Sequence, residues 1–107
     1  MPKAIIIKEF GSVDNLKICD LDLKPLNKNE LRIKQTAIGV NFLDIYHRLG
    51  THFQNILLPG IIGVEGVGIV EETHPSINDF VIGDKIAYPL NIGAYATHRN
   101  IDKNSCI

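Results

Sequence analysis

The sequence has few cysteines, no excess of either charge and no long hydrophobic run, and each absence excludes a class of protein. Its two cysteines, Cys19 and Cys106, are too few for a disulfide scaffold and form no C-x-x-C pair. A net charge of -1, with Lys and Arg spread along the chain, provides no electrostatic footprint for nucleic acid or an anionic membrane. No stretch is long enough for a signal peptide or a transmembrane helix. We therefore expect one domain, residues 1–107, with free thiols and a cytoplasmic location.

The chain also lacks a phosphate-binding loop, although the glycine-rich stretch LPGIIGVEGVGIVEE, residues 58–72, invites that interpretation. A dinucleotide-binding fingerprint reads G-x-G-x-x-G after a strand and before a helix. From Gly63 the spacing is the reverse, G-x-x-G-x-G, and Pro75 leaves no room for a useful helix. The Gly-Lys-Ser/Thr sequence of a Walker loop is absent as well. The stretch instead predicts a curved strand whose glycines permit bends and close packing.

Short segments with strand character, separated by turn signals, make up most of the chain. β-Branched or alternating residues predict strands at 4–10, 16–23, 31–40, 60–73 and 85–90. Gly83 and Asp84 predict a turn into the last of these strands. The segment 94–101 fits either a strand or a short helix. This pattern predicts a mostly-β, barrel-like domain, in which Tyr88 and Tyr95 belong to the core or to a cleft wall.

The segment NFLDIYHRLG, residues 41–50, changes to a helical period. Its apolar residues recur as on one helix face, at Phe42, Ile45, Tyr46 and Leu49. Asn41 is a favourable N-cap, Asp44 lies in the first turn, and Gly50 suits the position after the last turn. We expect a short helix over about 42–49, on which Asp44 and Arg48 are spaced to form an ion pair.

Four motifs extend over essentially the whole chain: AIGVNFLDIYHRLG, PGIIGVEGVGIVEE, VIGDKIAYP and GAYATH. In this order and spacing they resemble the amino-terminal domain of medium-chain dehydrogenases/reductases, most closely the quinone oxidoreductase, or zeta-crystallin-like, branch. The resemblance implies a GroES-like fold, a partly open β-barrel with one short helix, that supplies the substrate side of a cleft. It also implies that this chain stops before the Rossmann domain with its nicotinamide cofactor site. The carboxy-terminal segment that completes the first domain is then absent too.

The same resemblance bears on metal binding. Zinc-dependent members place a Cys where this chain has Asn41, and a His-Glu pair where it has Val64 and Glu65. Catalytic zinc needs three protein ligands, and neither Asn nor Val supplies a thiolate or an imidazole. The cysteine cluster of structural zinc is missing, and the histidines show no H-x-x-x-H or H-x-E spacing. We therefore expect no zinc site, as in the zinc-free quinone reductases.

The resemblance implies that Asn41, Phe42, Tyr46 and His52 border the nicotinamide and the substrate, with Asn41, Tyr46 and Glu65 as catalytic candidates. Asn41 can hold a carboxamide or a quinone oxygen, although capping the helix also explains it. Tyr46 either offers its hydroxyl to a carbonyl group or packs in the core. His52 replaces a tyrosine of the quinone reductases, and it either contacts the cofactor or is an ordinary loop residue. Glu65 either hydrogen-bonds in the cleft floor or, where burial raises its pKa, acts as a general acid.

The implied function is the substrate-side domain of an NADPH-dependent oxidoreductase that reduces quinones or conjugated carbonyls. Because the phosphate and adenosine sites lie elsewhere, we expect no turnover and weak or no NADPH binding from this chain, unless a separate Rossmann-domain chain supplies them. Two alternatives stay open, a standalone GroES-like binding or assembly module and a non-functional relic of a split gene. An uncovered apolar interface predicts self-association.

Overall fold

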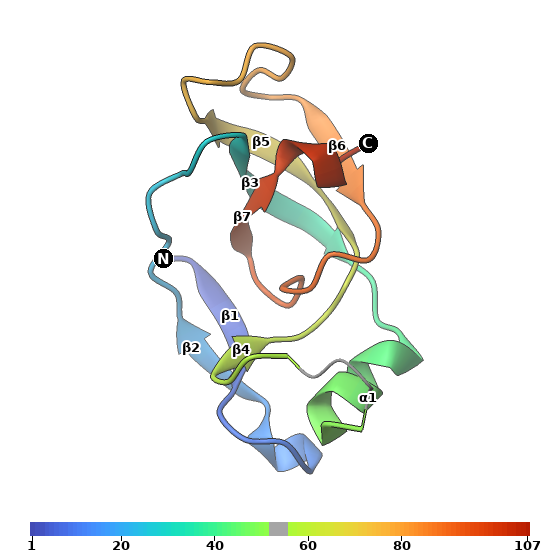
Figure 1. Cartoon of the computed structure of the whole chain (residues 1–107). Coiled ribbons are helices and arrows are strands. Elements are labelled where there is room, and N and C mark those ends of the chain that lie inside the picture. The colour runs from blue at the N-terminus through green and yellow to red at the C-terminus, as the bar shows by residue number, and fades with distance from the viewer. Residues whose placement is uncertain (52–55) are drawn as a thin grey trace.

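The computed structural model describes residues 1–51 and 56–107, and antiparallel strands dominate that part of the chain (Figure 1). The strands are β1 (Lys3–Ile7), β2 (Lys17–Asp20), β3 (Glu30–Ile38), β4 (Gly60–Ile61), β5 (Gly66–Thr73), β6 (Lys85–Tyr88) and β7 (His98–Asp102). The helical elements are α1 (Phe42–Leu49) and two short 3-10 helices, η1 (Val13–Asn15) and η2 (Lys103–Ser105). The mostly-β prediction with a helix at 42–49 is confirmed.

The strands form two sheets, ordered β2-β1-β4 and β6-β5-β3-β7. A single bridge between Ala4 and Ala96 links the smaller sheet to the segment that leads into β7. The sheets do not close on one another, so the barrel is partly open, as the resemblance implies. In Figure 1, α1 lies at the end of the molecule opposite the C-terminus, and its Arg48 carbonyl oxygen accepts from the Gly11 N–H over 2.9 Å.

The predicted strands are mostly shorter in the structure. The strand expected at 4–10 ends at Ile7, because a bend that includes Gly11 (φ 140°) follows it. The strands expected at 16–23 and 31–40 occupy 17–20 and 30–38. The segment 94–101 becomes strand only in β7, which decides between the two alternatives for it.

The prediction of a single strand over the glycine-rich stretch is wrong. The stretch divides into β4 and β5, which belong to different sheets. Gly63 has a φ of 92°, in the left-handed region, and a Cβ there would lie 2.4 Å from Tyr95 Cδ1. The glycine thus lets the chain turn from one sheet to the other against the Tyr95 ring. The predicted close backbone contacts are confirmed within β5, as at Gly68 against the Lys34 carbonyl oxygen.

The core lies on the inner face of the larger sheet. Its fully buried side chains include Leu31 and Ile33 of β3, Val70 of β5 and Ile101 of β7. β7 pairs with β3 only over Glu30–Lys34, whereas β5 continues to pair with β3 as far as Ile38. The last four residues of β3, 35–38, therefore have one edge without a strand partner among the described residues, and this edge faces a pocket.

Candidate functional site

The predicted site residues gather around the beginning of α1. Asn41 is the N-cap, with extended backbone at φ -132° and ψ 156°, and its N–H donates to Oδ2 of Asp44 over 3.0 Å. At the other end Gly50 adopts the left-handed conformation, φ 75°, that ends the helix. The predicted cap, helix and stop are all confirmed.

The apolar face of α1 is turned outward. Phe42 is 80% exposed and Tyr46 49% exposed, whereas Asp44 is 2% and His47 7% exposed. The core alternative for Tyr46 is therefore wrong. The helix places the Phe42 and Tyr46 rings on an open surface, and it points a carboxylate into the molecule.

Tyr95 is the partner of that carboxylate. Its hydroxyl donates to Oδ2 of Asp44 over 2.7 Å, across 51 positions of sequence. Burial, and then the hydrogen bond and charge of Asp44, hold the pKa of the Tyr95 phenol well above its ordinary value. Arg48 instead donates to the Gly11 carbonyl oxygen, so the predicted Asp44–Arg48 ion pair is wrong.

Asp44 is the residue of this site whose role the sequence interpretation missed. Its position in the sequence predicts a favourable first-turn residue and an ion pair with Arg48, and the helix period does not predict its burial. The tyrosine in GAYATH was the available signal, because a buried phenol requires a hydrogen-bond partner.

Two polar atoms at the start of α1 are buried and have no hydrogen-bond partner in the described chain, Nδ2 of Asn41 and Oδ1 of Asp44. A buried amide nitrogen or carboxylate oxygen without a partner costs free energy, and such groups are rare in folded proteins. One atom is a donor and the other an acceptor. The beginning of α1 therefore retains an unused hydrogen-bonding capacity of both kinds.

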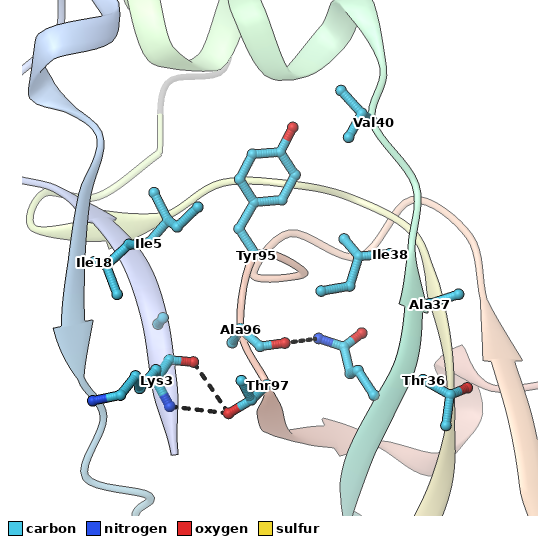
Figure 2. Close-up of a pocket in the computed structure, with 12 residues that line it drawn as sticks. Lys3, Ile5, Ile18, Thr36, Ala37, Ile38, Val40, Tyr95, Ala96 and Thr97 are labelled. Carbon is cyan, nitrogen blue, oxygen red and sulfur yellow. Dashed lines mark hydrogen bonds between the residues drawn. The ribbon is translucent and has the colours of Figure 1, made fainter. Parts of the chain in front are cut away.

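A pocket of about 630 Å³ adjoins this end of the helix (Figure 2). It lies between β1 and β2 on one side and the free edge of β3 on the other, with the segment 95–97 behind it. Much of its lining is apolar, including Ile5, Ile18, Ile38 and Val40, and Figure 2 shows the Tyr95 ring at the wall with its hydroxyl directed toward α1. The cleft-wall prediction for Tyr95 is confirmed.

Gln35 fixes the back of this pocket. Its Nε2 donates to the carbonyl oxygens of Ala94 and Ala96, each over 2.8 Å, and its Oε1 accepts from the Tyr88 hydroxyl. Tyr88 is buried, as predicted, and burial raises its pKa. These bonds attach the segment that carries Tyr95 to the centre of the larger sheet.

Glu65 lies against the backbone just before Asn41. A Cβ at Gly39 would stand 2.1 Å from Oε1 of Glu65, and the Gly39 N–H donates to the Glu65 carbonyl oxygen over 3.1 Å. Glu65 itself is exposed, whereas Val64 is buried in the core. The structure thus brings Glu65 to the loop that precedes α1. His52 lies outside the described residues.

Neither a metal centre nor a membrane span is found in the described part of the chain. No group of three His, Cys, Asp or Glu side chains within 1–51 and 56–107 is arranged to hold a metal ion. No described helix has the length and apolar character needed to cross a bilayer.

Comparison with known proteins gives consistent matches. A family model described as the alcohol dehydrogenase GroES-like domain matches residues 27–106. A 2-haloacrylate reductase from Burkholderia is 34% identical over 102 residues, which are 92% of this chain and 31% of that protein. A quinone oxidoreductase from Pseudomonas aeruginosa is 34% identical over 97 residues, 90% of this chain and 30% of that protein.

Solved structures agree with the sequence matches. A Pseudomonas syringae quinone oxidoreductase superposes with a TM-score of 0.93 at 29% identity, over 100% of this chain and 33% of that one. An Escherichia coli quinone oxidoreductase complexed with NADPH gives 0.91 at 27% identity, over 98% of this chain and 32% of that one. The chain spans about a third of the length of these relatives.

Proposed function

Because the chain belongs to the alcohol dehydrogenase GroES-like domain family, we propose that it forms the substrate-side domain of an NADPH-dependent reductase of quinones or conjugated carbonyls. The relatives named as quinone oxidoreductases, one of them complexed with NADPH, support this proposal. The observation that carries it in this chain is the buried, unpartnered Asn41 amide among the described residues, at the helix end beside exposed aromatic rings.

Asn41 is the residue we assign to hold the reacting groups. Its Nδ2 needs an acceptor, and either the carboxamide oxygen of a nicotinamide or a quinone oxygen has that chemistry. NADPH would supply the hydride, while the protein orients the ring and the acceptor. Phe42 and Tyr46 offer their exposed rings to the same surface, and the Tyr46 hydroxyl is available to a carbonyl oxygen. We keep His52 as a proposed cofactor contact.

Glu65 is proposed as a support for this site. Its side chain lies over Gly39, two residues before Asn41, so it limits how the loop into α1 can move. A general-acid role for Glu65 would require burial that raises its pKa, and Glu65 is exposed. The ligand chemistry of Asn41 and Val64 favours a reaction without zinc, because neither side chain is a zinc ligand.

The proposed reaction needs a second domain, in the same or another chain, that binds the phosphates and adenosine of NADPH. We propose that the isolated chain has no turnover, because positioning of cofactor and substrate between two domains provides most of the rate. The outward apolar face of α1, with Phe42 and Leu49, is a surface that such a domain, a separate chain or a second copy would cover.

The test is a nuclear magnetic resonance titration of this chain with 1,4-naphthoquinone. We expect shifts of backbone and side-chain amide signals at Asn41, Phe42 and Tyr46, and their loss in Asn41→Ala. Asn104→Ala, in η2 at the opposite end of the molecule, is the matched control and should titrate like the unchanged chain (Figure 1). Shifts elsewhere only, or equal titration of both variants, would overturn the proposal.

A further inference from the structure

One carboxylate oxygen at the start of α1 serves two distant parts of the chain. Oδ2 of Asp44 accepts from the Asn41 N–H over 3.0 Å and from the Tyr95 hydroxyl over 2.7 Å. The first contact belongs to the helix cap, and the second reaches the wall of the pocket. The carboxylate is therefore a direct connection between the residue assigned to the ligand and the pocket beside it.

The environment of Asp44 makes this connection costly to disturb. The residue is 2% exposed, and its other oxygen, Oδ1, has no hydrogen-bond partner within the described chain. A buried carboxylate with few donors depends strongly on each donor that it has. The Tyr95 hydroxyl is thus important for keeping Asp44 in place, and Asp44 in turn holds the Asn41 backbone.

We infer that Asp44 is a positioning residue, which uses the Tyr95 hydroxyl as its anchor to fix the placement of Asn41 relative to the pocket. Tyr95 is itself fixed from behind, since Gln35 holds the carbonyl oxygens on either side of it, at Ala94 and Ala96. The placement of Asn41 consequently depends on the larger sheet through Gln35, Tyr95 and Asp44. That Asn41 meets a ligand rests on the proposed function, whereas the coupling itself does not.

The coupling can be measured without any ligand, by nuclear magnetic resonance of Tyr95→Phe. This variant removes one hydroxyl, whose hydrogen bond goes to Asp44 and not to Asn41. We expect the Asn41 backbone N–H signal to shift upfield, because its bond to the Asp44 carboxylate loosens, and the Asn41 side-chain amide signals to move with it. Tyr46→Phe removes a hydroxyl from α1 itself and is the matched control, for which the Asn41 signals should stay in place.

A second variant, Asp44→Asn, separates positioning from general stability. It keeps the shape of the side chain and its acceptor oxygen but removes the charge. The hydrogen bond that the Asn41 N–H donates to this side chain should therefore weaken, and the Asn41 backbone N–H signal should shift upfield as in Tyr95→Phe. A purely structural role would lower the unfolding midpoint and leave the Asn41 signals of the folded variant where they are.

The inference is overturned if the Asn41 signals are unchanged in a folded Tyr95→Phe variant, or if they are unchanged in a folded Asp44→Asn variant. Failure of the naphthoquinone titration with these two results intact would instead count against the proposed function alone. If both hold, Tyr95→Phe should also weaken the naphthoquinone-induced shifts at Asn41.

Discussion

At the scale of single residues, Gly68 lets β5 approach β3 more closely than any residue with a side chain would allow. A Cβ at Gly68 of β5 would lie 2.6 Å from the Lys34 carbonyl oxygen and 3.2 Å from Gln35 Cα, both backbone atoms of β3. The pairing of β3 with β5 shifts its register just after Gln35. The glycine thus permits the close approach that sets Gln35 under the pocket.

We expect Gly68→Ala to lower the free energy of unfolding by about 1–3 kcal/mol, because overpacking against backbone forces the strands apart. Gly39→Ala is the matched control. The three atoms nearest to a Cβ there all belong to the exposed Glu65 side chain, at 2.1–2.6 Å. A side chain can move aside more easily than the backbone of a neighbouring strand, so this variant should cost less. Urea denaturation measures both. Equal losses would show that general strand propensity, rather than close approach at Gly68, sets the cost.

Tyr88 gives a prediction for high pH. Burial raises the pKa of its phenol above the ordinary value of 10.0, although Arg99 and Gln35 oppose the increase. Above a pH of about 10 the unfolded chain therefore loses the proton while the folded chain keeps it, so stability is present at lower pH and is lost as pH rises. The half-buried thiol of Cys106, whose pKa is also raised by desolvation, acts in the same direction.

Urea denaturation of the unchanged chain should show a free energy of unfolding that falls from a pH of about 9 to about 11. In Tyr88→Phe the starting stability is lower, because the bond to Gln35 is lost, but the fall with pH should be shallower. Parallel curves for the two proteins would mean that Tyr88 does not contribute to the loss at high pH.

At the scale of elements, α1 separates what the sequence predicts from what it does not. Its bounds, its N-cap at Asn41 and its stop at Gly50 were predictable, because caps and periodicity are local. Its buried face was not, since the buried Asp44 meets its partner Tyr95 across 51 positions of sequence, a contact that no local pattern encodes. The division of the glycine-rich stretch into β4 and β5 was equally hidden, because it depends on a turn of Gly63 against Tyr95.

The exposed apolar face of α1 is expected to drive self-association. A Phe42→Gln, Leu49→Gln double variant should reduce concentration-dependent association in sedimentation experiments, with a loss of less than about 1 kcal/mol in stability, since both side chains are largely outside the core. Ile33→Val is the control, because it removes a methylene from the core and should cost about 0.5–1.5 kcal/mol without changing association. Association that persists in the double variant would assign it to another surface.

At the scale of the whole molecule, the proposed function makes this fold one half of a two-sided site. The family and the mostly-β architecture could be read from four motifs in order, and the described structure agrees with both. The pocket could not be read in this way, because its walls come from β1, β2, β3 and the segment before β7, which only the assembled sheets bring together. In the described residues, helix α1 follows β3 without a glycine-rich phosphate loop.

This arrangement predicts that the chain does not distinguish NADPH from its nicotinamide half. The binding residues proposed at Asn41, Phe42 and Tyr46 are suited to a nicotinamide ring, and no phosphate loop accompanies them in the described structure. Reduced nicotinamide mononucleotide should therefore bind this chain about as weakly as NADPH, in titrations followed by the fluorescence of the reduced ring. Asn41→Ala should weaken both ligands by the same factor, and Asn104→Ala neither. If NADPH binds more than about tenfold tighter than the mononucleotide, a difference of about 1.4 kcal/mol, the chain recognises the adenosine half as well. The proposal that it supplies only the substrate side of the site would then be wrong.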